Sequence, residues 1–599
     1  MDAPFFNYNV PNEWISECHS KHKDSCEEAQ ATVARVLGKN PSMILIDLER
    51  QCLIQDTEGK EYVCLSYVWG PSKNPFRATK SNFAELLSTD SLRRNQHRLP
   101  QTIRDAMTVA ANLSFNYLWV DRLCILQDDP LILDDQIAYM ASTYALAAFT
   151  IVASYGSDDN TGIPGVSLPR SISRSTYRFG HSAVFTRYNN DWSEDRDVWH
   201  SRAWTFQERL ISSRCIVFYR GTMKWECGHH TRHELFDGMQ SEPKLRVDMR
   251  SWPDVQQYTD CVRAYTARNL TYQEDVIKAF SAVTRFFEPS FPDGMLWGVP
   301  EFVFDSCLTW RSGALQVRRP GFPSWSWIGW IGAMQPGWPG ICDWEPTYPR
   351  IRQDPYISRP LVGWRKKRNS SSVGVAVKSS DAYWQSFRGD LFSALPSGWM
   401  RLPESEAYQH ETFSHKELGI ASGSRFWHPV PINPIGVHRF TQGTQPWGPK
   451  LYGKAQIVTL ISGDSFTQEF AYHNALIHHG MFLGPRSRSD MPLSFDLLDA
   501  TLGWCGTILS NSLTSDSYIR GALCELVAIS EGTCFLMNSE GWDQNLAYKT
   551  TGYTNGPIQV TNVIWICWDN GVAYRHGIGR IWKKQWDLLS PVTKEIVLG

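Results

Sequence analysis

The 599-residue sequence lacks the short motifs that identify several large enzyme classes. It has no GxxxxGK[ST] loop for nucleotide triphosphates and no GxGxxG turn that would open a Rossmann fold. It also has no HExxH helix and no GxSxG nucleophile elbow. Nucleoside triphosphatases, Rossmann dehydrogenases, zinc proteases and α/β-hydrolases are therefore disfavoured.

The sequence also lacks a signal peptide pattern, a membrane-spanning run and a strong net charge. The first residues, MDAPFFNYNVPNEW, show no basic segment followed by an apolar one, and no run approaches the roughly 18 apolar residues of a membrane span. The formal net charge of -2 gives no overall attraction to nucleic acid or anionic membranes. We therefore expect a cytoplasmic protein without nucleic-acid binding, whose 14 cysteines are reduced and buried.

A chain of this length exceeds one hydrophobic core, so several domains are expected. The pattern predicts a helical and strand lead-in (1–54), an α/β domain (55–230, with core segments 62–153 and 201–227 and an insertion at 156–198), a helical and Trp-rich extension (250–345), a partly flexible linker (346–450) and a β-containing C-terminal region (451–599). In the last of these, Asn570-Gly571 predicts a tight hairpin turn.

Strand-like and helix-like segments alternate in the α/β domain. The stretch YVCLSYVWG at 62–70 is typical of a buried strand that ends at Trp69-Gly70. Later segments predict a helix from Leu99 with Thr102 as cap, further strands at 117–120 and 149–153, and a helix from Ser201 as cap. This alternation predicts an α/β layer with a largely parallel sheet.

Polar side chains follow two of the predicted strands. Ser66 and Tyr67 stand just before the first strand exit, and Asp121 follows the next strand. Ligands of open α/β sheets collect at the carboxyl ends of strands. Two interpretations stay open, a binding site or a packed corner, and for Asp121 the favoured role is to accept backbone hydrogen bonds.

Glu208 is the main candidate for acid–base chemistry. On a helix it shares a face with Trp204 and Ile211, where burial would disfavour its charged form, as in many catalytic carboxyls. The alternative, favoured by spacing alone, is a salt bridge to a nearby arginine. Cys124 is a second candidate, as a thiol nucleophile, but its apolar neighbours favour a buried inert thiol.

Three potential metal ligands occur near the N-terminus. Cys18, His22 and Cys26 follow at i, i+4 spacing and would line one face of a helix over residues 12–40. They would hold Zn²⁺ if a fourth ligand came from elsewhere. No CxxC pair accompanies them, and a structural helix with half-buried thiols is the favoured alternative.

Three ordered blocks resemble the fungal heterokaryon-incompatibility (HET) domain proteins. They are YVCLSYVWG at 62–70, LPQTIRDAM at 99–107 leading to YLWVDRLCILQDD at 117–129, and SRAWTFQERLISSRCIVFY at 201–219. The chain departs from the family pattern at Ala203, where Gly is usual, and at Arg122, where a small residue is usual.

The resemblance implies a role in non-self recognition and programmed cell death, with protein partners or self-association. It also implies a TIR-like fold, in which Glu208 would act on NAD as a substrate, with no required cofactor. Ser66, Tyr67 and Trp69 would then line the strand-end pocket, and Trp204 belongs to the matching W-x-x-x-E helix. The alternatives are a non-catalytic signalling module and a degenerate paralogue without activity.

Overall fold

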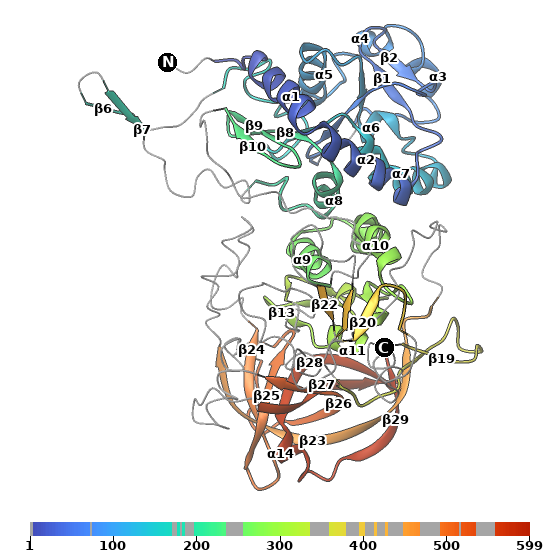
Figure 1. The fold of residues 1–599 in the computed structure, drawn as a ribbon, viewed down its shortest axis with the longest axis vertical. Coiled ribbons are helices and arrows are strands. Elements are labelled where there is room, and N and C mark those ends of the chain that lie inside the picture. The colour runs from blue at the N-terminus through green and yellow to red at the C-terminus, as the bar shows by residue number, and fades with distance from the viewer. Residues whose placement is uncertain are drawn as a thin grey trace. The chain divides into compact units, whose positions relative to one another are not determined.

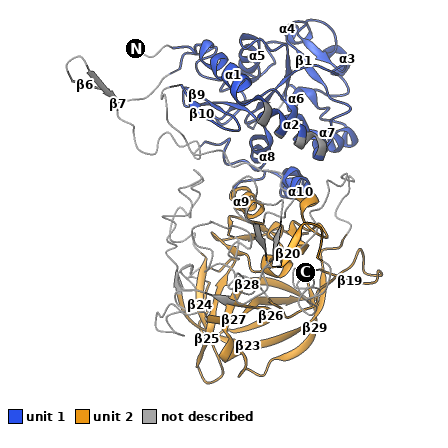
Figure 2. Cartoon of the chain, in the orientation of Figure 1, with its two compact units in different colours: residues 1–249, 268–286, 475–482 blue, residues 250–267, 287–474, 483–599 orange. Residues whose placement is uncertain are grey.

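The computed structural model (Figure 1) describes most of the chain. The described residues are 4–71, 75–170, 176–179, 182–185, 197–234, 255–335, 359–378, 395–401, 413–415, 426–428, 447–467, 492–513, 517–534 and 558–599. They belong to two compact units (Figure 2): unit 1 comprises residues 1–249, 268–286 and 475–482, and unit 2 comprises 250–267, 287–474 and 483–599.

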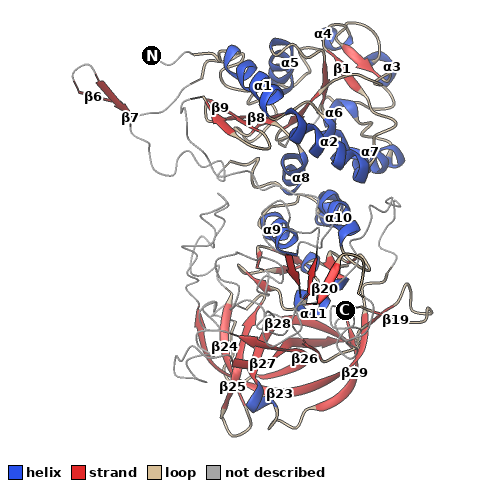
Figure 3. Cartoon of the chain, viewed as in Figure 1, coloured by secondary structure: helices blue, strands red, loops and turns tan. Residues whose placement is uncertain are grey.

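Unit 1 is built on an eight-stranded sheet in the order β10-β9-β8-β5-β3-β4-β1-β2. Helices, drawn blue in Figure 3, surround this sheet. The four central strands β8, β5, β3 and β4 are parallel, and antiparallel strands extend both edges. The predicted α/β layer with a parallel core is therefore confirmed. The strands are β1 (Leu45–Asp47), β2 (Cys52–Ile54), β3 (Val63–Ser66), β4 (Tyr117–Trp119), β5 (Thr150–Ala153), β8 (Cys215–Tyr219), β9 (Thr222–Glu226) and β10 (Thr231–His233).

The helices of unit 1 form where apolar residues recur at helical spacing, and these residues pack on the sheet. They are α1 (Asn9–Lys21), α2 (Lys23–Leu37), α3 (Phe83–Leu86), α4 (Ser91–Arg94), α5 (Gln101–Asn112), α6 (Asp121–Cys124), α7 (Pro130–Leu146) and α8 (Ala203–Ile211), with short 3-10 turns at Gln273–Val276 and Lys278–Phe280. α5 packs on β3 and β4, whereas α8 packs on β3 and α7. Asp129 caps α7 by accepting from the backbone N–H of Leu131.

Two predicted helix caps are wrong. α5 begins one residue before Thr102, whose hydroxyl instead accepts a hydrogen bond from the backbone N–H of Gly162. α8 begins after Arg202, and the Ser201 hydroxyl donates to the carbonyl of Val198. Thr102 binds a loop 60 residues further along the chain, and Ser201 bonds back to the turn that precedes α8. The single polar helix expected at 12–40 is also two helices, because α1 ends at Lys21 and α2 begins at Lys23.

Unit 2 is rich in β-structure. Its ten-stranded sheet closes on itself because β23 pairs with both β24 and β26. The strands are β17 (Arg359–Pro360), β18 (Arg365–Lys366), β19 (Val375–Ala376), β23 (Leu451–Thr467), β24 (Leu493–Leu498), β25 (Trp504–Ser510), β26 (Leu523–Cys534), β27 (Ile558–Asp569), β28 (Val572–Trp582) and β29 (Val592–Leu598). Asn570 and Gly571 join β27 to β28 with φ of 49° and 76°, so the predicted tight turn is confirmed.

Smaller elements complete the two units. They are α9 (Val255–Thr266), α10 (Ser281–Phe287), α11 (Phe304–Cys307), α14 (Lys583–Trp586), the hairpin β6 (Thr176–Phe179) and β7 (Ser182–Phe185), and the short strands β11 to β16 between Met295 and Gln335 and β20 to β22 between Trp399 and His428. Most of the linker predicted at 346–450 lies outside the described residues, although β17, β18 and β19 join the large sheet. Over the described ranges, no helix has the length and apolar character that crossing a membrane requires.

Candidate functional site

The chain reverses direction across the parallel sheet at β3. It moves from β3 to β4 through α5, then returns past β3 to β5 through α7 and continues to β8 through α8. Right-handed crossovers therefore place α5 on one face and α7 and α8 on the other. The helices that follow β3 and β5, α5 and α8, thus lie on opposite faces, and this change of direction is the topological switch point where open α/β sheets bind ligands.

Ser66 and Glu208 meet at this switch point. Ser66 is the last residue of β3, and its buried hydroxyl donates a hydrogen bond to Oε2 of Glu208 in α8. The same hydroxyl accepts a hydrogen bond of 2.8 Å from Nε1 of Trp199, which is also fully buried. Two of the predicted site residues are thus in direct contact, and Trp199 is a third member that sequence reasoning did not identify.

Burial changes the acidity of Glu208. Desolvation raises its pKa to about 7, with a further contribution from the negative charge of Asp121. Hydrogen bonds from Ser66 and Tyr144 and the charge of Arg202 oppose this rise in the pKa. The carboxyl therefore changes protonation near neutral pH, the range in which a carboxyl serves as either acid or base. No salt bridge explains its burial, since among the described side chains its hydrogen-bond donors are hydroxyls.

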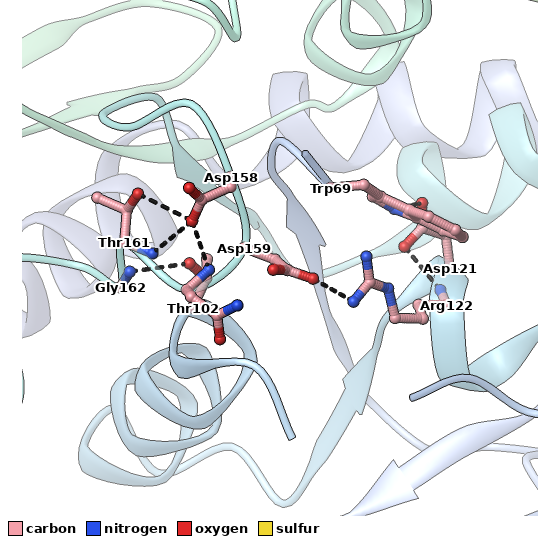
Figure 4. Close-up of polar contacts among 9 residues, drawn as sticks. Trp69, Thr102, Asp121, Arg122, Asp158, Asp159, Thr161 and Gly162 are labelled. Carbon is pink, nitrogen blue, oxygen red and sulfur yellow. Dashed lines mark hydrogen bonds and ion pairs between the residues drawn. The ribbon is translucent and has the colours of Figure 1, made fainter. Parts of the chain in front are cut away.

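Trp69 and Asp121 form a second pair at the strand ends (Figure 4). Trp69 Nε1 donates to Oδ2 of Asp121 over 2.8 Å, and Oδ1 of Asp121 accepts from the backbone N–H of Arg122 over 2.7 Å. The favoured role of Asp121 as an acceptor of a backbone hydrogen bond is therefore observed. Burial raises the pKa of Asp121, whereas the hydrogen bond from Trp69 and the charge of Arg122 lower it.

Arg122 occupies the space between these strand ends. It is 1% exposed and forms an ion pair with the buried carboxylate of Asp159. Its guanidinium lies 4.5 Å from the ring centroid of Trp69 and 6.0 Å from that of Tyr67. Arg122 is the bulky cation that stands where the family pattern usually has a small residue. Asp159, in the loop after β5, thus neutralises its charge.

Tyr67 has a buried polar atom, its hydroxyl oxygen. Its side chain is 4% exposed, and its hydroxyl makes no hydrogen bond with the described residues. Burial raises the pKa of this phenol, so it stays protonated and able to donate. An unpaired buried hydroxyl at a switch point, beside Asp121 and Arg122, is suited to a ligand oxygen or nitrogen.

The loop after β5 closes over the strand ends. Asp158 accepts hydrogen bonds from the backbone N–H groups of Asn160 and Thr161, and the Thr102 hydroxyl holds Gly162 (Figure 4). Gly70 has a φ of +71°, and a Cβ there would lie 2.3 Å from the Cβ of Asp158. A small hollow of about 10 Å³ near Gly162 is lined by none of the predicted site residues.

The remaining candidates lie apart from this group. The Trp204 side chain is half-buried and forms a hydrogen bond with Asp275. Cys124 is fully buried and receives a backbone N–H from Val120 at its sulfur, and burial raises its pKa to about 12. Both facts favour an inert thiol rather than a nucleophile.

The predicted metal ligands meet a partner from a distant part of the sequence. Sγ atoms of Cys18 and Cys26 lie 3.9 Å apart. Ligand atoms of Cys18, His22 and Cys227 lie within 4.8 Å of one another. Cys227 was not identified as a ligand from the sequence, because it stands alone between β9 and β10 without a neighbouring cysteine.

Comparison with known proteins addresses the domain that contains the strand-end site. Residues 62–208 match the family model described as "Heterokaryon incompatibility protein (HET)". No curated protein and no solved structure matches the chain. The matched range includes Ser66, Trp69, Asp121 and Glu208, and it ends at the carboxyl described above. Residues 62–208 therefore form a HET domain, and the chain is a HET domain-containing protein.

Proposed function

We propose that the HET domain executes an incompatibility reaction, leading from non-self recognition to programmed cell death in the cytoplasm, by hydrolysing NAD at the switch point. The observation that carries this proposal is the Ser66–Glu208 hydrogen bond, which holds a carboxyl with a pKa of about 7 at the strand end. Buried carboxyls with such a pKa are concentrated at functional sites.

The chemistry assigned to this site is cleavage of an N-glycosidic bond. The bond between ribose C1′ and nicotinamide breaks, and nicotinamide leaves with the bonding electrons. Water forms the new C1′–O bond and releases one proton to the solvent. Ionised Glu208 would stabilise the positive charge that develops on the ribose or hold its hydroxyls. Tyr67, the residue after Ser66, offers a hydroxyl that has no partner among the described residues, and Trp69 offers a ring for stacking.

A second candidate is a non-catalytic signalling module that acts by self-association. The observation in its favour is that Ser66 and Trp199 are both 0% exposed. A buried hydroxyl between an indole and a carboxyl is also what a satisfied structural network looks like. In that case Glu208 fixes α8 on β3, and the surface of the domain carries the signal.

NAD measurements in cells that express the full chain distinguish the two functions. We expect the wild type to be toxic and to deplete NAD, and Glu208→Gln to abolish both effects while remaining folded. Glu85→Gln, an exposed carboxyl of α3, is the control and should behave as the wild type. Toxicity with unchanged NAD would exclude the hydrolase and support the signalling module, whereas neither toxicity nor NAD loss would exclude both.

A further inference from the structure

Three cysteines and a histidine converge beside the edge of the unit 1 sheet. Cys18 is in α1, His22 is the cap residue that follows this helix, and Cys26 lies in the first turns of α2. Cys227 directly follows β9, and the separation between His22 and Cys227 is 205 residues. The three thiols are 2%, 2% and 6% exposed, so the cluster is closed to solvent on the sulfur side.

Two distances within this cluster match those of one tetrahedral ion, and Cys26 is close to Cys18 although it lies outside the group of Cys18, His22 and Cys227 whose ligand atoms are all within 4.8 Å of one another. Zn–S bonds of about 2.3 Å and Zn–N bonds of about 2.0–2.1 Å place two sulfurs about 3.8 Å apart, and a sulfur and a nitrogen about 3.6 Å apart. The Sγ atoms of Cys18 and Cys26 are separated by 3.9 Å, and Cys227 Sγ is 3.6 Å from Nδ1 of His22. The separation of 3.9 Å is far longer than a disulfide bond.

A buried arginine lies next to the cluster, and its positive charge would be stabilised by a negative charge nearby. Arg214 is 3% exposed, and its Nε donates to the Cys18 sulfur over 3.4 Å. Its other partners are the neutral oxygens of Gln30 and Ala148, and no carboxylate pairs with it within the described part of the chain. Buried cations are normally paired. Three thiolates and a neutral imidazole around Zn²⁺ carry a net charge of about −1, which would balance the guanidinium.

The turn that carries Cys227 directs backbone N–H groups at the sulfur of this residue. The backbone N–H groups of His229 and His230 hydrogen-bond to this sulfur, and the backbone N–H of Cys227 donates to the carbonyl of His230. The rings of His229 and His230 pack against His22, with centroids 5.0 and 4.7 Å away. Such outer contacts orient metal ligands and stabilise thiolates.

We propose that Cys18, His22, Cys26 and Cys227 bind one Zn²⁺ ion in a closed structural site. Of the 13 residues of α1, only Pro11, Ile15 and Cys18 are buried, so apolar contacts hold this helix weakly. The ion fastens α1 and α2 to the turn between β9 and β10. Four protein ligands leave no open position, which assigns the ion to folding and not to catalysis.

Metal analysis of the purified full chain tests this site. We expect about one equivalent of Zn²⁺ per chain, and we expect a mercurial reagent to release it as about three thiols react. Replacement by Co²⁺ should give the intense visible bands of a tetrahedral site with thiolate ligands. Both measurements use the wild type, so neither depends on whether a variant folds.

Variants locate the ion. Cys227→Ser should lose most of the Zn²⁺ on dialysis against a chelator, whereas Cys567→Ser, which removes the exposed cysteine of β27, should retain it. Zinc-supplemented wild type holding less than about a tenth of an equivalent would overturn the proposal. So would Co²⁺ spectra without tetrahedral bands, or a Cys227→Ser chain that keeps its Zn²⁺ as firmly as the wild type.

Discussion

The Ser66 hydroxyl at the end of β3 donates a hydrogen bond to the carboxylate of Glu208 in α8, across 142 residues of sequence. This bond joins the first and last segments of the matched family range at the switch point of the sheet. It also places a buried carboxyl where it is held by hydroxyl donors rather than by a counter-ion. Its consequences for stability are measurable independently of any activity.

Glu208 should make unit 1 less stable as the pH rises. Its pKa is raised from 4.5 to about 7 in the folded chain, so between these values the folded state binds more protons than the unfolded state. The stabilisation from the protonated carboxyl is complete below pH 4.5 and is lost as the pH rises to about 7. Glu208→Gln should match the wild type near pH 4 to 5 and exceed it by about 3 kcal/mol at pH 8.

Chemical denaturation of unit 1 at a series of pH values measures this difference, with hydrogen exchange of the β3 amides to identify the transition. Glu85→Gln serves as the control, because its carboxyl is exposed. Parallel pH profiles for the wild type and Glu208→Gln would contradict the raised pKa of Glu208.

Ser66→Ala should destabilise unit 1 by about 2–3 kcal/mol, because it leaves a buried carboxyl and a buried indole N–H without their shared partner. The hydrogen bond from Ser66 lowers the pKa of Glu208, so the variant should also raise that pKa above its present value of about 7. Thermal unfolding measures the first effect, and NMR titration of labelled glutamate carboxyls measures the second.

Ser201→Ala is the matched control for this substitution. The Ser201 hydroxyl donates to a carbonyl near the surface instead of capping α8, so the change in unfolding free energy should stay within about 0.5 kcal/mol. A loss of about 1 kcal/mol would instead be the signature of a helix cap. Equal losses of unfolding free energy in Ser66→Ala and Ser201→Ala would contradict the stabilising role of the Ser66 hydroxyl.

The local features of this fold were predictable from the sequence because short-range patterns determine them. YVCLSYVWG is apolar enough to be a buried strand, and Asn570-Gly571 adopts the positive φ values that a two-residue hairpin needs. The parallel core follows from alternating strands and helices. Ser66 contacts Glu208 between the sheet and α8, whereas the role of these residues as a ligand site stays a prediction.

Partners separated by long stretches of chain were not predictable. The indole of Trp199 reaches Ser66 across 133 residues, and Asp159 neutralises Arg122 from within a segment of low periodicity. Cys227 joins the N-terminal ligands only because β9 and β10, the strands on either side of it, form the sheet edge beside α1 and α2. In each case the tertiary fold, and not local spacing, selects the partner.

The Arg122–Asp159 ion pair should be strongly coupled. Both side chains are almost fully buried, so Arg122→Met or Asp159→Leu alone leaves an unpaired buried charge and should cost about 3–5 kcal/mol. The double variant removes both charges, and it should be destabilised by less than the sum of the two single variants.

A double-mutant cycle on thermal or chemical unfolding gives the coupling energy, which we expect to be about 1–3 kcal/mol. The exposed pair of Arg93 and Asp90, 2.8 Å apart, is the control and should show coupling below about 1 kcal/mol. Additive effects of Arg122→Met and Asp159→Leu would show that the pair does not hold the loop to the strand ends.

Gly70→Ala should displace the loop that covers the strand ends. Gly59 and Gly70 both have positive φ, +68° and +71°, so alanine costs about 1–2 kcal/mol at either position for the backbone alone. At Gly59 no atom lies within 4 Å of the added Cβ, but at Gly70 the Cβ and Cα of Asp158 lie at 2.3 and 2.7 Å. Overpacking of this kind adds about 1–3 kcal/mol.

Gly70→Ala should therefore unfold more readily than Gly59→Ala and open residues 154–162 to limited proteolysis. Equal stability and equal cleavage of the two variants would mean that the loop does not close on the exit of β3.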